Sequence, residues 1–193
     1  MNKKITILWK VIKPLLKKAK RKDFVLHTRM VYKAMTAIIS KEGGDSDILI
    51  PAALLHDVGW SEVPLNLQMA NDKKLSHQAL VLHIKKAPAI ITRILEKHDY
   101  KTERIEKIVR VVEAHKFTDP DEKDKQLLID ADALADVYKQ SFYSDIKAYG
   151  TMPEDHLNFR SKNTFYTKTA RNIFERLLKK REKEIIFYNC HSN

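Results

Sequence analysis

Residues 49–59 read LIPAALLHDVG, and this stretch decides the expected fold. Leu49 and Ala52 precede His56 by seven and four positions, which is the spacing of residues on one face of a helix. Apolar residues recur at intervals of three and four along most of the chain, and no segment alternates convincingly at two. The pattern therefore predicts an all-α protein.

The composition favours one compact helical domain. The chain has 193 residues, of which 44% are hydrophobic and 32% are charged, as in an ordinary globular protein. It contains four Gly and six Pro, so turns are scarce and long helices are favoured over a sandwich or a barrel. We expect a basic helix at residues 1–22 packed on a helical core at residues 23–184, with a tail at residues 185–193.

Cysteine content and apolar run lengths predict a cytoplasmic protein. Cys190 is the single cysteine, which excludes an internal disulfide and a Cys-based zinc finger and fits a reducing compartment. The apolar stretch at residues 48–55 is far shorter than the roughly 20 residues that cross a bilayer. The uncharged stretch between Lys4 and Lys10 is too short for a signal peptide. We therefore expect no membrane span.

Eight helices are expected from the spacing of apolar residues. Pro14 kinks or divides the first of them, and a pair of glycines separates the second from the third. Pro88 is expected at the first position of the fifth helix, and Thr102 and Thr164 are expected as N-caps. The expected ranges are residues 4–20, 24–42, 47–58, 73–86, 88–98, 102–115, 123–149 and 163–184.

Most of the net charge of +11 lies at the N-terminus, where residues 1–22 hold nine Lys or Arg and no acid. A basic face of this kind can bind the phosphates of nucleic acid or of anionic lipid. The same lysines alternate with Ile5, Leu8 and Ile12, which is typical of an amphipathic helix that packs its apolar side on the body. We favour the packed helix, because no other nucleic-acid recognition motif accompanies the basic segment.

Histidines and aspartates on the predicted apolar faces are the candidates for chemistry. The positions three, four and seven after His27 are apolar, so its ring is expected to face inward. His56 and Asp57 are adjacent at a helix end, where their side chains point about 100° apart and can both reach an ion between them. Gly59 then lets the chain turn away from this pair.

Asp132 is expected to face inward as well, because apolar residues stand three and four positions before it. An unpaired buried carboxylate normally takes up a proton, whereas a divalent cation stabilises its charged form. Alone, each of these groups would be read as a core histidine or a surface acid. Together, His27, His56, Asp57 and Asp132 form a nitrogen and oxygen donor set suited to a divalent ion such as Mn, Fe, Co, Ni, Zn or Mg.

Four segments resemble the HD-domain metal-dependent phosphohydrolases, whose pattern is His, then His-Asp, then a distant Asp. The similar segments are AALLHDVG at residues 52–59, VEAH at 112–115, DADAL at 130–134 and FYTKTAR at 165–171. The resemblance covers about residues 24–180 and implies a single compact helical HD-domain bundle. It also implies that His27, His56, Asp57 and Asp132 ligate the metal, with Asp132 preferred to Asp130 because it is the second acid of its segment.

This resemblance implies hydrolysis of a phosphate ester of a nucleotide or related small molecule, by attack of a metal-bound water. Asp57 would ligate the metal and orient the water, and His77 or His115 would stabilise the developing charge or protonate the leaving oxygen. Arg29, together with the lysines at positions 73 and 74, supplies candidate contacts to phosphate. A small phosphorylated substrate is thus the expected partner, and a homo-oligomer stays open.

Two other classes of function stay open. The chain could keep the HD fold and the metal yet act as a regulatory module that binds phosphate esters without turnover. It could instead be a basic helical protein that binds nucleic acid through residues 1–22. Deleting that segment would then abolish binding, and His56→Ala would not.

Overall fold

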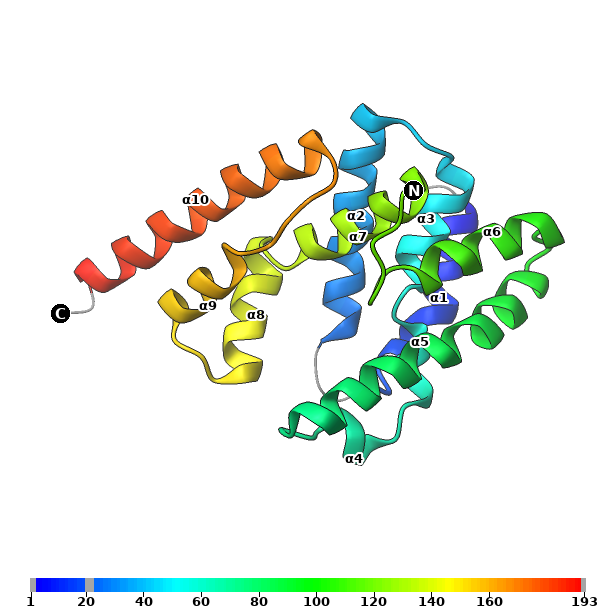
Figure 1. The fold of residues 1–193 in the computed structure, drawn as a ribbon, viewed down its shortest axis with the longest axis horizontal. Coiled ribbons are helices and arrows are strands. Elements are labelled where there is room, and N and C mark those ends of the chain that lie inside the picture. The colour runs from blue at the N-terminus through cyan, green and yellow to red at the C-terminus, as the bar shows by residue number, and fades with distance from the viewer. Residues whose placement is uncertain (1–2, 20–22, 192–193) are drawn as a thin grey trace.

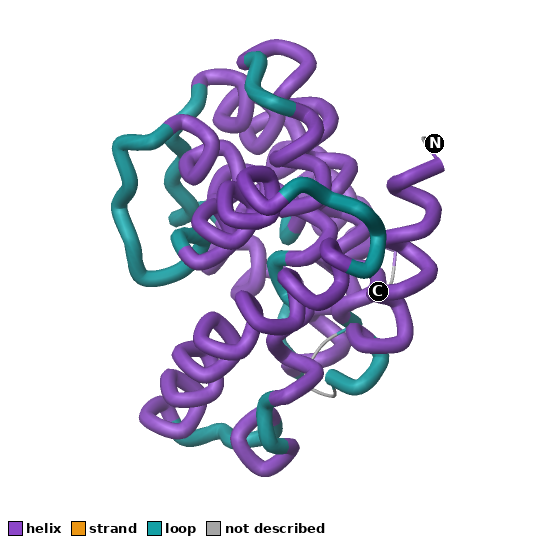
Figure 2. Tube along the Cα trace, turned by 90° about the vertical axis from the view of Figure 1, so that its right-hand side faces the viewer, coloured by secondary structure: helices purple, strands orange, loops and turns teal. Residues whose placement is uncertain are grey.

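The computed structural model shows an all-α bundle, which confirms the expected fold class (Figure 1). No strand occurs among residues 3–19 and 23–191, which are the residues that the structure describes (Figure 2). The elements are α1 (Lys3–Leu16), α2 (Phe24–Glu42), α3 (Ser46–Leu55), the 3-10 helix η1 (Val58–Glu62), α4 (Leu65–Gln68), α5 (Lys73–Glu96), α6 (Thr102–Glu113), α7 (Lys123–Ala135), α8 (Lys139–Tyr149), α9 (Pro153–Arg160) and α10 (Lys168–His191).

Parts of two expected segments lie outside the described residues. They are residues 1–2 and 20–22 of the basic N-terminal segment, residues 192–193 of the expected tail, and the side chain of Cys190. Within the described part, none of the helices has the length and the apolar character needed to cross a membrane.

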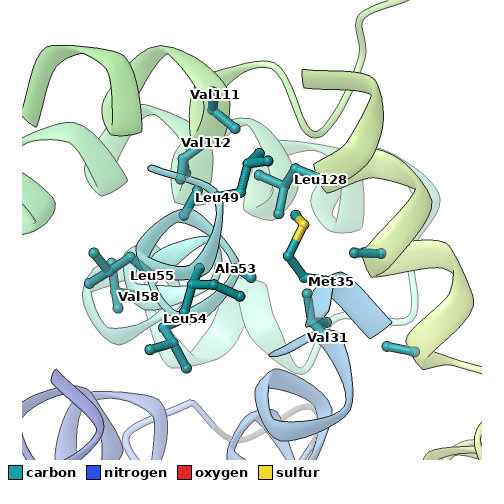
Figure 3. Close-up of a cluster of buried hydrophobic side chains, with 14 of the residues drawn as sticks. Val31, Met35, Leu49, Ala53, Leu54, Leu55, Val58, Val111, Val112 and Leu128 are labelled. Carbon is teal, nitrogen blue, oxygen red and sulfur yellow. The ribbon is translucent and has the colours of Figure 1, made fainter. Parts of the chain in front are cut away.

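Helix α3 lies at the centre of the bundle, where it contacts α1, α2, α6 and α7. Residues 48–55 are all buried, so the long apolar stretch of the sequence is a helix covered on every side. Figure 3 shows Leu49 and Ala53 of this helix close to Met35 of α2 and Leu128 of α7. Helix α2 in turn packs along α7, so three segments that are distant in the sequence meet in one core.

The N-terminal helix is amphipathic, as its sequence predicts. Leu8, Ile12 and Leu16 are buried against the body, while the lysines of α1 are exposed. Pro14 lies inside α1, two residues before the helix ends, so it does not divide the helix. The apolar side of the segment is therefore used for packing, and the basic side faces outward.

One helix occupies residues 73–96, where two were expected. Pro88 lies inside α5 and not at the start of a new helix. Proline removes one backbone hydrogen bond and normally interrupts a helix. Here Ala87, Ile90 and Ile91 are buried on either side of it, and α5 packs along η1 and α6. These tertiary contacts outweigh the local preference of proline and keep the helix continuous.

The prediction of a single helix at residues 123–149 is wrong as well, because the structure has two helices there. α7 ends at Ala135 and α8 begins at Lys139, because Val137 is buried in the connection and Tyr138 has an extended backbone with ψ of 140°. α9 is a further helix that apolar spacing does not indicate. It begins with Pro153, at a position where the missing N–H of proline costs nothing.

Neither expected threonine is the N-cap of its helix, and the last helix extends further toward the C-terminus than expected. Thr102 is the first helical residue of α6 and not its cap. Thr164 precedes α10 by several residues, and instead the hydroxyl oxygen of Thr167 accepts a hydrogen bond of 3.2 Å from the backbone N–H three residues later. α10 continues to His191, so residues 185–191 are helical and do not form a tail.

Candidate metal centre

The four expected ligands come from three helices of the central core. His27 lies on the first turn of α2, where Asp23 caps the helix by accepting a 3.1 Å hydrogen bond from a backbone N–H. His56 and Asp57 follow the last turn of α3. Asp132 lies on α7, which packs along α2. The packing of α2, α3 and α7 therefore decides whether these side chains meet (Figure 1).

The structure brings all four side chains to one point. His27 Nε2 lies 2.8 Å from Asp132 Oδ1 and 3.6 Å from Asp57 Oδ2. His56 Nε2 lies 3.1 Å from Asp57 Oδ2, 3.6 Å from Asp132 Oδ1 and 3.4 Å from His27 Nε2. Ligand atoms that sit at right angles around an ion at 2.0–2.2 Å are about 3 Å apart. The spacing of His27, His56 and Asp57 thus fits one divalent cation, and Asp132 Oδ1 lies within 3.6 Å of both imidazole nitrogens.

The orientation of the two imidazole rings supports the same fit. His56 Nδ1 donates a hydrogen bond of 2.9 Å to the carbonyl oxygen of Ala53, so its Nε2 is left with a lone pair that faces the cluster. His27 Nδ1 lies 3.4 Å from Asp136 Oδ1, on the side of the ring away from the other ligands. A carboxylate or carbonyl behind a histidine is the usual way in which a metal-ligating ring is held.

Both carboxylates of the cluster stay ionised although they are buried. Burial raises the pKa of Asp57, but the neighbouring His56 and His27 outweigh burial and hold that pKa below its usual range. Burial likewise raises the pKa of Asp132, and here Lys116 and His27 hold it well below the usual range. Buried carboxylates in contact with two imidazoles form a cluster that could hold a metal ion.

Lys116 is a member of the site that sequence reasoning missed. Its ammonium group donates a hydrogen bond to Asp132 Oδ2. Burial lowers the pKa of Lys116, but Asp132 and Asp57 outweigh burial and raise it, so the side chain keeps its positive charge. Its position directly after His115, in the resembling segment VEAH, is the signal that could have identified it.

A second group of ligand atoms adjoins the first and shares Asp57 with it. One atom each from Asp57, His83 and His115 lies within 4.8 Å of the others, and all three residues are buried. His115 Nδ1 donates to the carbonyl oxygen of Val112 at 2.5 Å, which leaves its Nε2 without a partner, and both ring nitrogens of His83 have none. Burial lowers the pKa of His115 to about 3 and that of His83 to about 4, so both rings are neutral donors near pH 7.

His83 reaches this group because η1 and α5 approach each other closely at Gly59. A Cβ atom at Gly59 would lie 2.0 Å from the carbonyl oxygen of His83 and 3.1 Å from the backbone nitrogen of Ala87. Glycine is needed there for close approach of two backbones, and not for the turn that the sequence suggested. On its own helix His83 follows the ordinary amphipathic spacing, so nothing in the sequence marks it as a site residue.

The structure does not bring His77 to the cluster. His77 is exposed on α5, and its ring packs on Phe117 with 5.0 Å between centroids. It stands six positions before His83, which places it about 240° around the helix from that residue. Arg29, a candidate phosphate contact, instead stacks over Trp9 of α1 at 5.9 Å.

Asp130 has a different environment from Asp132, two residues further on. Its two carboxylate oxygens accept hydrogen bonds of 2.8 Å from the backbone N–H groups of Tyr166 and Thr167, and one of 2.6 Å from the Thr167 hydroxyl. Asp130 therefore fixes the start of the segment FYTKTAR against α7. Asp132, in contrast, faces His27 and the cluster.

A cavity of about 580 Å³ opens onto the cluster. Three of the expected ligands, His27, Asp57 and Asp132, line it together with Lys116. Phe24 and Trp60 contribute aromatic surface, and their ring centroids lie 5.3 Å apart. Other lining residues come from the end of α8, the following loop and α9, and these are Tyr149, Thr151, Asp155, His156, Phe159 and Arg160.

Comparison with known protein families matches residues 24–137 to the HD domain. The matched part contains His27, His56, Asp57 and Asp132 and ends before α8. Searches among curated proteins and among solved structures found no match. The match covers more than half of the 193 residues and agrees with the all-α bundle. The chain therefore belongs to the HD domain family.

Proposed function

We propose that this protein is a metal-dependent phosphohydrolase that cleaves a phosphate ester of a nucleotide or related small molecule. The observation that carries the proposal is the convergence of His27, His56, Asp57 and Asp132 beside a cavity, where each imidazole Nε2 lies 2.8–3.6 Å from both carboxylates. Membership of the HD domain family supports the same reading.

In this proposal the four side chains hold a divalent ion. When bound, such an ion would supply Lewis-acid polarisation of the phosphate and an activated water. Asp57 would orient that water, since it lines the cavity and contacts both imidazoles. Lys116 would contact the phosphate, because it lines the cavity next to the ligands and carries a positive charge.

Of the two histidines expected to move a proton, His115 is the better candidate. Its ring lies against that of His56, with 5.4 Å between centroids, whereas His77 is exposed and packs on Phe117. Because its Nδ1–H is bonded to the carbonyl oxygen of Val112, His115 offers a lone pair on Nε2 beside Asp57, and we assign to it a proton-accepting or ligating role and not protonation of the leaving oxygen.

Elemental analysis of untagged protein, followed by a panel of phosphate esters with added Mn²⁺, tests the proposal. The wild-type protein should carry a divalent metal and hydrolyse at least one ester. His56→Ala and Asp57→Ala should lose the metal and reduce hydrolysis at least about 100-fold. His98→Ala serves as the control, because His98 is a half-buried histidine at the end of α5, away from the cluster.

The outcomes separate the candidate functions. If the two ligand variants keep both metal and hydrolysis, the proposed centre is wrong. If the wild type binds metal and a phosphate ester tightly but never turns it over, the protein is a regulatory binding module and not an enzyme.

A further inference from the structure

We propose that the loop after α8 and helix α9 form a specificity wall, which binds the alcohol portion of the substrate as a flat ring bearing hydrogen-bond donors. The inference rests on the proposed function, because it takes the phosphate to lie at the metal ligands. The substrate class that fits is a nucleoside monophosphate. The wall consists of Tyr149, Thr151, Asp155, His156, Phe159 and Arg160, and it lies beyond residues 24–137, the part matched to the HD domain.

Aromatic side chains of the wall are exposed although they line a cavity. Phe159 has 61% of its surface exposed and Tyr149 has 46%. Arg160 lies over the Phe159 ring at 5.2 Å from its centroid, and the exposed remainder of the ring can take a planar ligand that stacks on it, as bases do without regard to their identity. Phe24 and Trp60 add two further rings to the lining. The cavity is therefore better suited to a ring than to a short aliphatic alcohol.

The wall is held at a fixed place relative to the metal ligands. Arg160 donates hydrogen bonds of 2.7 Å to Asp136, at the end of α7, and of 2.7 Å to Asp145 of α8. Asp136 also lies 3.4 Å from Nδ1 of His27. A continuous set of polar contacts thus joins α9 to the first metal ligand. A substrate that spans the cavity would meet both ends in a defined geometry.

The charges of the cavity favour a substrate with one phosphate. Among its described lining residues, the acids are Asp57, Asp132, Asp136 and Asp155, and the fully basic residues are Lys116 and Arg160. Both cations are already paired with aspartates. One divalent ion would balance the two excess negative charges of the lining, but a chain of three phosphates would bring several more negative charges toward Asp155 and Asp136.

Asp155 gives the wall a hydrogen-bond preference. An exposed carboxylate accepts hydrogen bonds and donates none, so it selects hydroxyl or amino groups on the ligand. A sugar hydroxyl or an exocyclic amine provides such a group, and a further phosphate does not. Stacking on Phe159 and donation to Asp155 together describe a nucleoside.

Binding of adenosine to the EDTA-treated protein tests the wall without turnover, since adenosine has no phosphate and needs no metal. Calorimetry should detect binding, and Phe159→Ala should weaken it about tenfold. Met152→Ala is the matched control, because Met152 is exposed in the same segment but does not line the cavity, and it should bind adenosine like the wild type.

Kinetics of the Mn²⁺-loaded protein test selectivity. We expect kcat/KM for adenosine monophosphate to exceed that for adenosine triphosphate at least tenfold, and Asp155→Asn to narrow this ratio. The preference for adenosine monophosphate over glycerol 3-phosphate should fall about tenfold in Phe159→Ala.

The two proposals fail in different ways. If adenosine binds in a Phe159-dependent manner but no ester is cleaved, binding of a nucleoside by the wall is supported and the proposed hydrolase activity is wrong. If glycerol 3-phosphate and adenosine monophosphate are cleaved equally well, and Phe159→Ala changes neither binding nor selectivity, the hydrolase proposal stands and the wall is refuted.

Discussion

Asp130 and Asp132 are separated by one residue on α7, and both are buried. Three hydrogen bonds from residues 166 and 167 occupy the carboxylate of Asp130, whereas Asp132 contacts His27 and Lys116. The pair therefore separates a structural carboxylate from a proposed metal ligand within one helical turn. Substituting each in turn distinguishes loss of stability from loss of the metal.

Asp130→Asn is expected to destabilise the protein by about 1–3 kcal/mol and to leave metal affinity as it is. The amide nitrogen of Asn cannot accept the hydrogen bonds that one carboxylate oxygen now accepts, so donors stay unpaired. Asp132→Asn should instead lower metal affinity at least tenfold. Urea unfolding and metal titration measure the two effects. Equal loss of metal in both variants would contradict the assignment of Asp132 as the ligand.

Gly59→Ala should destabilise the protein by about 3 kcal/mol or more, because the new methyl group would meet the rigid backbone of α5 at 2.0 Å. Relief of this clash would separate η1 from α5 and displace His83. Ser61→Ala in the same short helix is the comparison. It loses one 2.7 Å hydrogen bond to a carbonyl oxygen and should cost no more than about 1.5 kcal/mol. Similar denaturation midpoints for both variants would argue against the close approach.

Among the helices, the basic amphipathic pattern of α1 is compatible with two roles, packing on the body and binding of nucleic acid. Its buried residues Leu8, Ile12 and Leu16 pack against the body, and its lysines are exposed. The packing role follows directly from this burial. The exposed charge is compatible with nucleic-acid binding but is equally expected of any amphipathic helix at a surface.

Ile12→Ala is expected to lower the free energy of unfolding by about 2–5 kcal/mol, since Ile12 is fully buried. Its exposed neighbour Lys13 gives the matched control, and Lys13→Ala should change that free energy by no more than about 0.5 kcal/mol. Chemical denaturation followed by circular dichroism measures both. A small effect of Ile12→Ala would mean that α1 is not part of the folded core.

Most of the fold could be predicted from the apolar spacing, which also directs His27, His56 and Asp132 inward, whereas Asp57 is proposed from its place beside His56 and from the family resemblance. Elements governed by tertiary contact could not. Pro88 stays inside α5 because the helix is packed on both sides of it, and α9 is too short to show a period. His83 joins the cluster only through the close contact at Gly59, which depends on how two distant segments dock. Spacing along one helix carries no information on such contacts.

For the molecule as a whole, the proposed metal should act as a stabilising ligand. The centre joins α2, α3 and α7, and without a cation it holds two ionised carboxylates in the core. A ligand that binds the folded state alone, at about 100 times its dissociation constant, adds about 2.7 kcal/mol. Metal removal should therefore weaken the entire bundle.

Treatment with EDTA is expected to lower the thermal midpoint of the wild-type protein by about 5–10 °C. His56→Ala, which removes a proposed ligand, should show a shift smaller than about 2 °C with the same treatment. Differential scanning calorimetry with and without re-added Mn²⁺ measures this. An equal shift in the two proteins would place the metal elsewhere.

The distance along the chain between the first and last ligands also bears on biosynthesis. His27 and Asp132 are 105 residues apart, and at roughly 5–20 residues/s the ribosome needs about 5–20 s to pass from one to the other. During that interval the nascent chain offers His27, His56 and Asp57 without their fourth partner. In the proposed centre, coordination of a cation by all four ligands therefore requires the docking of α7 on α2, which comes late in synthesis.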